Sequence, residues 1–162
     1  MKTIASTLFS IVLSFGLLAF AEPVEVTVKL SPAGSFIIKG KTVEGVAIAS
    51  NGSVSATNIN IPVNSLTSGI KLRDQHMRER LEGDKHPMIS LQSGDGSGNQ
   101  GKGLIKIKGI EKPIEGTYQV SGDSVTAEFK LSLKDFAIEK IRYLGVGVKD
   151  EVMVKVQVPL KK

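Results

Sequence analysis

The sequence contains no cysteine and no tryptophan, and it has only two tyrosines in 162 residues. The absence of cysteine excludes a disulfide framework, a thiolate nucleophile and a cysteine-ligated metal site. Aromatic residues make up 5% of the chain, and none forms a base-stacking motif, which argues against nucleic-acid binding. The chain is 41% hydrophobic and 23% charged, which is enough for one domain with a substantial core.

The first 21 residues have the pattern of a cleaved export signal. Lys2 supplies the positive start, residues 4–20 are mostly apolar, and Ala19-Phe20-Ala21 forms a small-residue cleavage site. The alternative is an uncleaved membrane anchor, but the apolar run is at the short end for a span and a good cleavage site follows it. We therefore expect a signal peptide over residues 1–21 and a soluble mature domain over residues 22–162, located in the periplasm or secreted.

The mature chain carries a mild excess of positive charge. The full sequence has a formal net charge of +5, and loss of Lys2 with the signal peptide leaves 5 − 1 = +4. Most lysines alternate with apolar residues, as expected for the solvated faces of strands. The excess favours weak attraction to an anionic membrane surface.

Most of the chain after residue 22 alternates between apolar and polar residues, which is typical of half-buried β-strands. Asn51-Gly52 is a strong hairpin signal, and we interpret the glycine-rich residues 94–103 as a flexible loop. Nine alternating segments, which we interpret as roughly eight strands, lie at residues 24–30, 36–39, 43–49, 54–61, 88–91, 105–108, 114–120, 125–133 and 152–158. Short turns between one-sided strands predict an all-β antiparallel fold, either a closed barrel or a two-layer sandwich. The inward positions are rich in Val, Ile and Leu, and none of them is charged.

Residues 73–82 interrupt this pattern and predict the one helix. They contain no Gly, no Pro and no β-branched residue, and Gly83 can end the helix. Such a short helix is marginal in water unless it docks on something. Its narrow apolar stripe, Ile70, Met77 and Leu81, is therefore expected to lie against the body of the protein.

Catalytic and metal-binding patterns are weak. Residues 96–101 spell G-x-G-x-x-G, but a strand follows where a phosphate site needs a helix. His76 and His86 are the only histidines, and a zinc site needs three or four ligands. Asp74 and Asp84 could add oxygen ligands, but Gly83 and Pro87 break any regular spacing. No serine lies in a nucleophile elbow. We expect no catalytic residues, no metal and no cofactor.

Several segments resemble the YceI-like family. Residues 65–70 (SLTSGI) and 72–78 (LRDQHMR) resemble its S-L-x-T-G and R-D-x-H-L-R signature. Residues 106–114 (KIKGIEKPI) resemble its L-T-I-K-G-V-T-K-P-V strand and turn. Residues 135–138 and 143–152 resemble its closing segment, so that the likeness covers most of the mature chain.

The resemblance implies an antiparallel, lipocalin-like eight-stranded barrel with one short helix beside it. It also implies an exported protein whose elongated pore holds an isoprenoid or a similar lipid. His86 stands where the family usually has Tyr, and Leu91 where it usually has Phe. Residues 28–39 lack the histidines that are usual in the family near the first two strands, so the ligand's polar head is expected to differ.

Together these observations predict a binding protein that holds an apolar chain in its pore as a carrier or store. No charged anchor is needed, because each buried CH₂ contributes about 0.8 kcal/mol. Tyr118 and Tyr143 can each offer a hydroxyl to a polar head. The alternative is an envelope stress or interaction protein with a closed core, and either is expected to be a monomer or a homodimer. The expected wall and mouth residues are Val28, Phe36, Ile38, Met77, Leu81, Leu91, Ile105, Tyr118, Phe129, Leu131, Phe136 and Tyr143.

Overall fold

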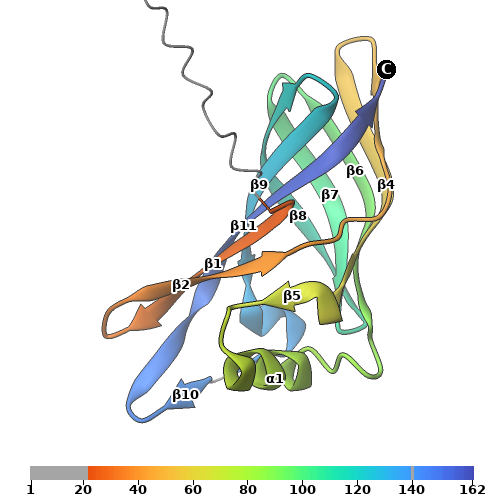
Figure 1. Cartoon of the computed structure of the whole chain (residues 1–162). Helices are drawn as coiled ribbons and strands as arrows, with labels where there is room; N and C mark the ends of the chain where they lie inside the picture. The colour runs from red at the N-terminus through yellow and green to blue at the C-terminus, as the bar shows by residue number, and fades with distance from the viewer. Residues whose placement is uncertain (1–21, 140) are drawn as a thin grey trace, which may run out of the picture.

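A computed structural model describes residues 22–139 and 141–162, so the expected signal peptide lies outside the described residues. The fold is almost entirely β, with one α-helix and two 3-10 turns (Figure 1). No helix in the described ranges is both long and apolar enough to cross a membrane. The strands are β1 (Val24–Ser31), β2 (Ser35–Gly40), β3 (Ala47–Ser50), β4 (Ser53–Pro62), β5 (Leu66–Thr67), β6 (Met88–Ser97), β7 (Gln100–Ile107), β8 (Ile110–Ser121), β9 (Ser124–Ser132), β10 (Arg142–Tyr143) and β11 (Val146–Lys161); the helix is α1 (Lys71–Arg80) and the 3-10 turns are η1 (Val63–Ser65) and η2 (Leu133–Phe136).

Seven strands close into a barrel in the order β3-β4-β6-β7-β8-β9-β11. All of these neighbours are antiparallel except at the seam, where the end of β11 runs parallel to β3. The seam is short, with Leu160 opposite Ala47 and Lys161 opposite Ile48. The barrel prediction is confirmed and the sandwich is not formed, but the closed ring contains seven strands where eight were expected.

Strands β1, β2 and β5 extend the sheet beyond the ring. β1 pairs with the first two thirds of β11, β2 pairs with β1, and β5 pairs with the end of β2 (Figure 1). The length of β11 makes this extension possible, because β9 pairs with one edge of the strand and β1 with the other. One face of β11 lies in the core, through Val152, Val154, Val156 and Val158. The core is continuous from the barrel to strands β1, β2 and β5.

The helix prediction over residues 73–82 corresponds to α1, shifted by two residues toward the N-terminus. Met77 and Leu81 pack against the core as expected, but Ile70 is half exposed because it precedes the helix as its N-cap. The flexible loop predicted for residues 94–103 is wrong. Those residues form the paired ends of β6 and β7, joined by a two-residue turn at Gly98-Asn99.

Candidate ligand-binding site

An apolar cavity of about 120 Å³ lies inside the barrel. None of its lining residues belongs to α1. The cavity is lined by Ala47, Val54, Ala56, Ile59, Leu91, Gly94, Asp95, Gly96, Gly101, Lys102, Gly103, Ile114, Glu115, Gly116, Thr117, Tyr118, Val125, Ala127, Glu128, Phe129 and Val158. The side chains that strand alternation turns inward from this set are aliphatic, aromatic or absent, so the wall offers a guest dispersion contacts rather than hydrogen bonds.

Glycines create the space. Two rows of neighbouring residues cross strands β4, β6, β7 and β8 on the inner face of the barrel. The first row runs Val54, Gly96, Gly101, Gly116, and the second runs Ala56, Gly94, Gly103, Ile114. A row of residues without side chains leaves room above the sheet that Val or Leu would fill.

Some of these glycines are also required by close packing. At Gly116 a Cβ would collide with the backbone oxygen of Glu128, and at Gly96 it would collide with the ring of Tyr118. Tyr118 therefore occupies part of the space that the glycine rows provide. Its backbone N–H donates to the carbonyl oxygen of Asn99 (3.1 Å), which fixes the strand beneath the ring.

The structure brings three of the twelve expected wall residues to this cavity, namely Leu91, Tyr118 and Phe129. The other residues lie elsewhere in or around the core. Val28, Ile105, Leu131 and Phe136 are buried in it, and Phe36, Ile38, Met77 and Leu81 are half-buried against it. The backbone of Tyr143 lies in β10, and its side chain lies outside the described part of the structure.

Sequence reasoning missed the small residues that make the cavity. Ala47, Ala56 and Ala127 line it together with the glycines, and none of these residues was a candidate. A signal was present, since Gly94 and Gly96 lie two residues apart, as do Gly101 and Gly103. Glycines spaced by two share one face of a strand.

The expectation that no inward position is charged is also wrong. Lys112 lies opposite Ile105 and shares the half-buried row of β8 with Ile110 and Ile114. Lysine tolerates such a position because its alkyl stem packs against apolar neighbours while the ammonium reaches for water.

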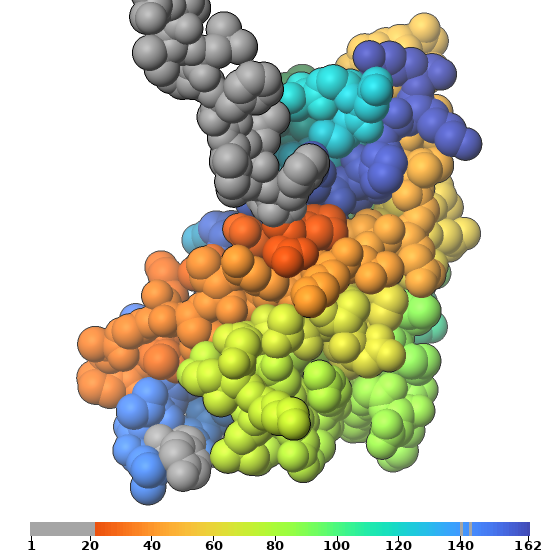
Figure 2. All heavy atoms as spheres, in the orientation of Figure 1, coloured from red at the N-terminus to blue at the C-terminus, as the bar shows by residue number. Residues whose placement is uncertain are grey.

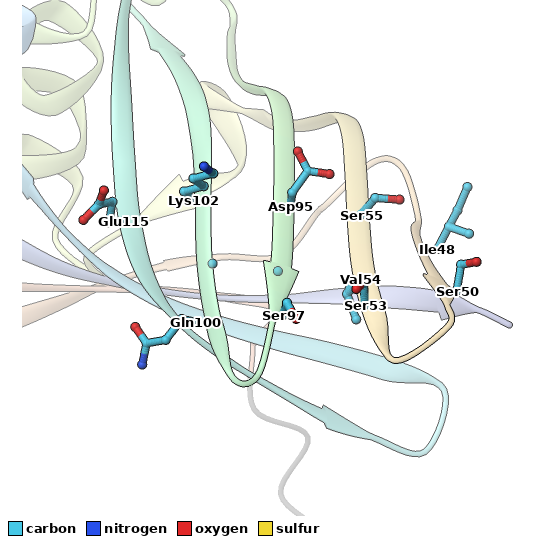
Figure 3. Close-up of a pocket in the computed structure, with 12 residues that line it drawn as sticks. Ile48, Ser50, Ser53, Val54, Ser55, Asp95, Ser97, Gln100, Lys102 and Glu115 are labelled. Carbon is cyan, nitrogen blue, oxygen red and sulfur yellow. The ribbon is translucent and has the colours of Figure 1, made fainter.

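A larger concavity, about 540 Å³, lies on the outer face of the barrel (Figure 3). Neighbouring residues along it, Ser55, Asp95, Lys102 and Glu115, form one polar row across strands β4 to β8. Figure 3 shows these side chains spread in a row across the strands rather than converging on one point. An apolar guest gains nothing from a wet, charged wall, so the smaller interior cavity is the better candidate site.

The helix is fastened beside the barrel by a buried carboxylate. Asp74 is 6% exposed and accepts hydrogen bonds from the Thr67 hydroxyl (2.5 Å), the Ser68 hydroxyl (2.6 Å) and the Ser68 N–H (2.7 Å). Burial acts to raise the pKa of Asp74, but the hydrogen bonds from Ser68 and Thr67 and the charge of Arg78 outweigh burial and hold the pKa below its usual value. The Arg73 guanidinium also lies 4.1 Å from the centroid of the Phe36 ring.

The two histidines do not share a site. His76 is exposed on α1, and the ring of His86 packs against Gly109, where a Cβ would lie 2.9 Å from its Cε1 atom. Among the residues that the structure describes, no group of three His, Cys, Asp or Glu side chains could hold a metal ion. His86 and Gly109 instead join the segment after α1 to the β7–β8 turn.

A closed, mostly antiparallel barrel with a docked helix defines a lipocalin-like fold. The chain belongs to the YceI-like family, whose domain it matches over residues 19–160. No curated protein shows significant similarity to the sequence.

Solved structures share the fold at low sequence identity. The crystal structure of Burkholderia cenocepacia BcnA is 16% identical with a TM-score of 0.61, and the alignment covers 83% of this chain and 94% of that one. A polyisoprenoid binding domain from Saccharophagus degradans, implicated in plant cell wall breakdown, is 14% identical with a TM-score of 0.53, covering 84% and 93%. The Campylobacter jejuni YceI protein is 14% identical with a TM-score of 0.50, covering 77% and 85%.

Proposed function

We propose that this chain is a binding protein, not an enzyme, and that it holds an apolar isoprenoid-type hydrocarbon inside its barrel. The observation that carries the proposal is the interior cavity of about 120 Å³ with its apolar wall. The polyisoprenoid-binding relative from Saccharophagus degradans supports the choice of ligand class. The signal-peptide pattern of residues 1–21 supports action outside the cytoplasm, where such a protein would carry or store its ligand.

The size of the cavity limits what enters it. An apolar protein cavity of about 150 Å³ binds benzene. The space here therefore suits one branched unit of about five carbons, which is the end of an isoprenoid rather than a long chain. Burying five carbons contributes about 4 kcal/mol, which corresponds to a Kd of about 1 mM for a short prenyl probe.

Longer ligands bind more tightly only if more of the chain is buried. Tyr118 and Phe129 border the cavity, and movement of either ring would lengthen it. Elsewhere the interior is occupied by buried apolar side chains, such as Phe136, which is only 1% exposed. This filling favours the second candidate function, an interaction protein with a closed core and no lipid.

The test uses purified residues 22–162 and a series of prenol, geraniol and farnesol, followed by NMR of the methyl and aromatic resonances. We expect saturable shifts at Leu91 and Phe129, with an affinity that rises along the series. Ala127→Leu fills the cavity and should abolish the shifts, whereas Gln119→Leu, on the exposed face of β8, should not change them. If no member of the series saturates and solvent extraction of the protein yields no lipid, the closed-core alternative holds.

A further inference from the structure

Two hairpin tips stand side by side at the corner of the molecule farthest from the barrel seam (Figure 1). One is the β1–β2 turn at residues 32–34, and the other is the β10–β11 turn at residues 144–145. Pairing across the strands fixes them together, because Gly147 is opposite Ser31 on one side and Arg142 on the other. Figure 2 shows both tips protruding from the body at this corner.

The tips expose apolar side chains. Leu144 is 84% exposed, the highest value among the large hydrophobic residues described, and Val146 is 41% exposed. Pro32 and Ala33 on the adjacent tip are also exposed. A lone exposed leucine is ordinary, but here an exposed leucine, valine, proline and alanine meet at one convex corner.

Within the two tip hairpins the charged residues are all basic, and the acidic residues Glu139, Asp150 and Glu151 lie just outside them. Residues 29–36 and 141–149 contain Lys29, Arg142 and Lys149 and no carboxylate. All three basic residues are exposed. The next acidic residue along β11, Asp150, already accepts hydrogen bonds from the Ser132 hydroxyl (2.6 Å) and the Lys134 N–H (2.9 Å).

We propose that these tips, residues 31–34, 142 and 144–147, form a docking surface for an anionic lipid bilayer. In this arrangement Leu144, Val146 and Pro32 enter the headgroup region, while Lys29 and Lys149 lie against lipid phosphates. A bilayer fits better than a protein partner, because a stable protein interface needs about 800 Å² per side with a packed core, and two convex turns offer neither. Apolar tips ringed by basic side chains match the interfacial region of a membrane in both polarity and charge.

The inference goes beyond the proposed function, since it concerns where the protein rests rather than what the barrel holds. Each basic side chain close to an anionic surface contributes about fivefold in affinity, so three predict a preference on the order of a hundredfold for anionic over zwitterionic vesicles. The preference should fall steeply as ionic strength rises, because salt screens exposed charges.

The experiment is co-sedimentation of residues 22–162 with two kinds of vesicle, pure phosphatidylcholine and phosphatidylcholine mixed with phosphatidylglycerol. We expect binding to the anionic vesicles, loss of most binding in Leu144→Glu, and at least tenfold weaker binding in Lys29→Glu/Lys149→Glu. The matched controls are Ile48→Glu, which replaces another exposed apolar residue on β3, and Lys41→Glu, which changes an exposed lysine beyond the other end of β2. Both controls should bind as the parent does.

Two outcomes would overturn the proposal. One is that the protein does not bind the anionic vesicles, or that the control variants lose as much binding as the tip variants. The other is that sedimentation velocity shows a dimer abolished by Leu144→Glu with no vesicle binding, which would assign the tips to self-association. Neither outcome bears on the prenol titration, so this inference and the proposed function fail separately.

Discussion

The ring of Tyr118 on β8 occupies the space that a side chain on Gly96 would need, although β7 lies between their two strands. The absence of a side chain at one position therefore sets the place of an aromatic ring at another. Because Tyr118 also borders the cavity, this pair couples the shape of the site to the packing of the sheet.

Gly96→Ala should lower the free energy of unfolding by about 1–3 kcal/mol, because the added methyl forces the Tyr118 ring to move. Gly101→Ala is the matched control, since a Cβ there would meet Tyr118 Cδ1 at an ordinary 3.6 Å. Urea unfolding of both variants measures the difference. In a Tyr118→Ala background the cost of Gly96→Ala should largely vanish, and an undiminished cost there would contradict this account.

Asp74 should make the docking of α1 sensitive to acid. Its pKa is lower in the folded protein than in the unfolded chain, so its contribution to stability is present at neutral pH and is lost as the pH falls from about 4 through the folded-state pKa. Asp74→Asn should cost about 1–2 kcal/mol at pH 7 and less at pH 3, as measured by urea midpoints at both values.

Asp150 provides a comparison within the same protein. A hydrogen bond from the Ser132 hydroxyl is the main cause of its lowered pKa. Asp150→Asn should therefore also lower the urea midpoint more at pH 7 than at pH 3. The Glu79 side chain is exposed and accepts a hydrogen bond from the Gln75 side-chain amide (3.0 Å), so Glu79→Gln should leave both midpoints unchanged. If Glu79→Gln changed the urea midpoints as much as Asp74→Asn, the acid sensitivity would come from the charges on the helix surface in general and not from Asp74.

Lys108 holds three segments together. Its ammonium lies 3.3 Å from Glu82 after α1 and donates to the carbonyl oxygen of Ala137 (3.0 Å). The Lys108 side chain is only 17% exposed, so Lys108→Met should cost about 1–2 kcal/mol and speed hydrogen exchange at residues 81–86. The exposed pair of Lys130 and Glu151 is the control, and Lys130→Met should change stability by no more than about 0.5 kcal/mol.

The barrel seam depends on Leu160. This residue is buried and lies opposite Ala47, so Leu160→Ala should cost about 2–4 kcal/mol and raise hydrogen exchange in β3 before the other barrel strands. Ile48→Ala, at the next seam position but 52% exposed, should have little effect. Equal protection of β3 and β7 in the Leu160 variant would show that the seam is not the weak point.

Alternation predicted most strands because one face of each is buried, as in β9, where Val125 and Leu131 face the core. The same reasoning failed at Gly94 to Gly103, since glycine has no side chain with which to show a buried face. Nor could alternation count the strands in the ring. That number depends on the pairing of Leu160 with Ala47, which are far apart in the sequence and carry no local sign of their contact.

The candidate site was less accessible to sequence reasoning than the fold. Large residues such as Phe136 and Ile105 were expected to line a pore, but large side chains fill space rather than leave it, and both are buried in packed core. The open volume lies where Ala56 and Gly103 are both opposite Gly94 on β6. The expectation of an export signal at residues 1–21 stays a prediction.

Strand β11 runs for 16 residues without a turn, about 53 Å at the usual rise per residue. Near its first end it pairs with the tip of β1, and at its last end it closes the ring against β3. It therefore connects the protruding corner directly to the β11–β3 pairing that closes the barrel. A force or tilt applied at that corner reaches the two-residue closure through backbone alone, with no intervening loop to absorb it.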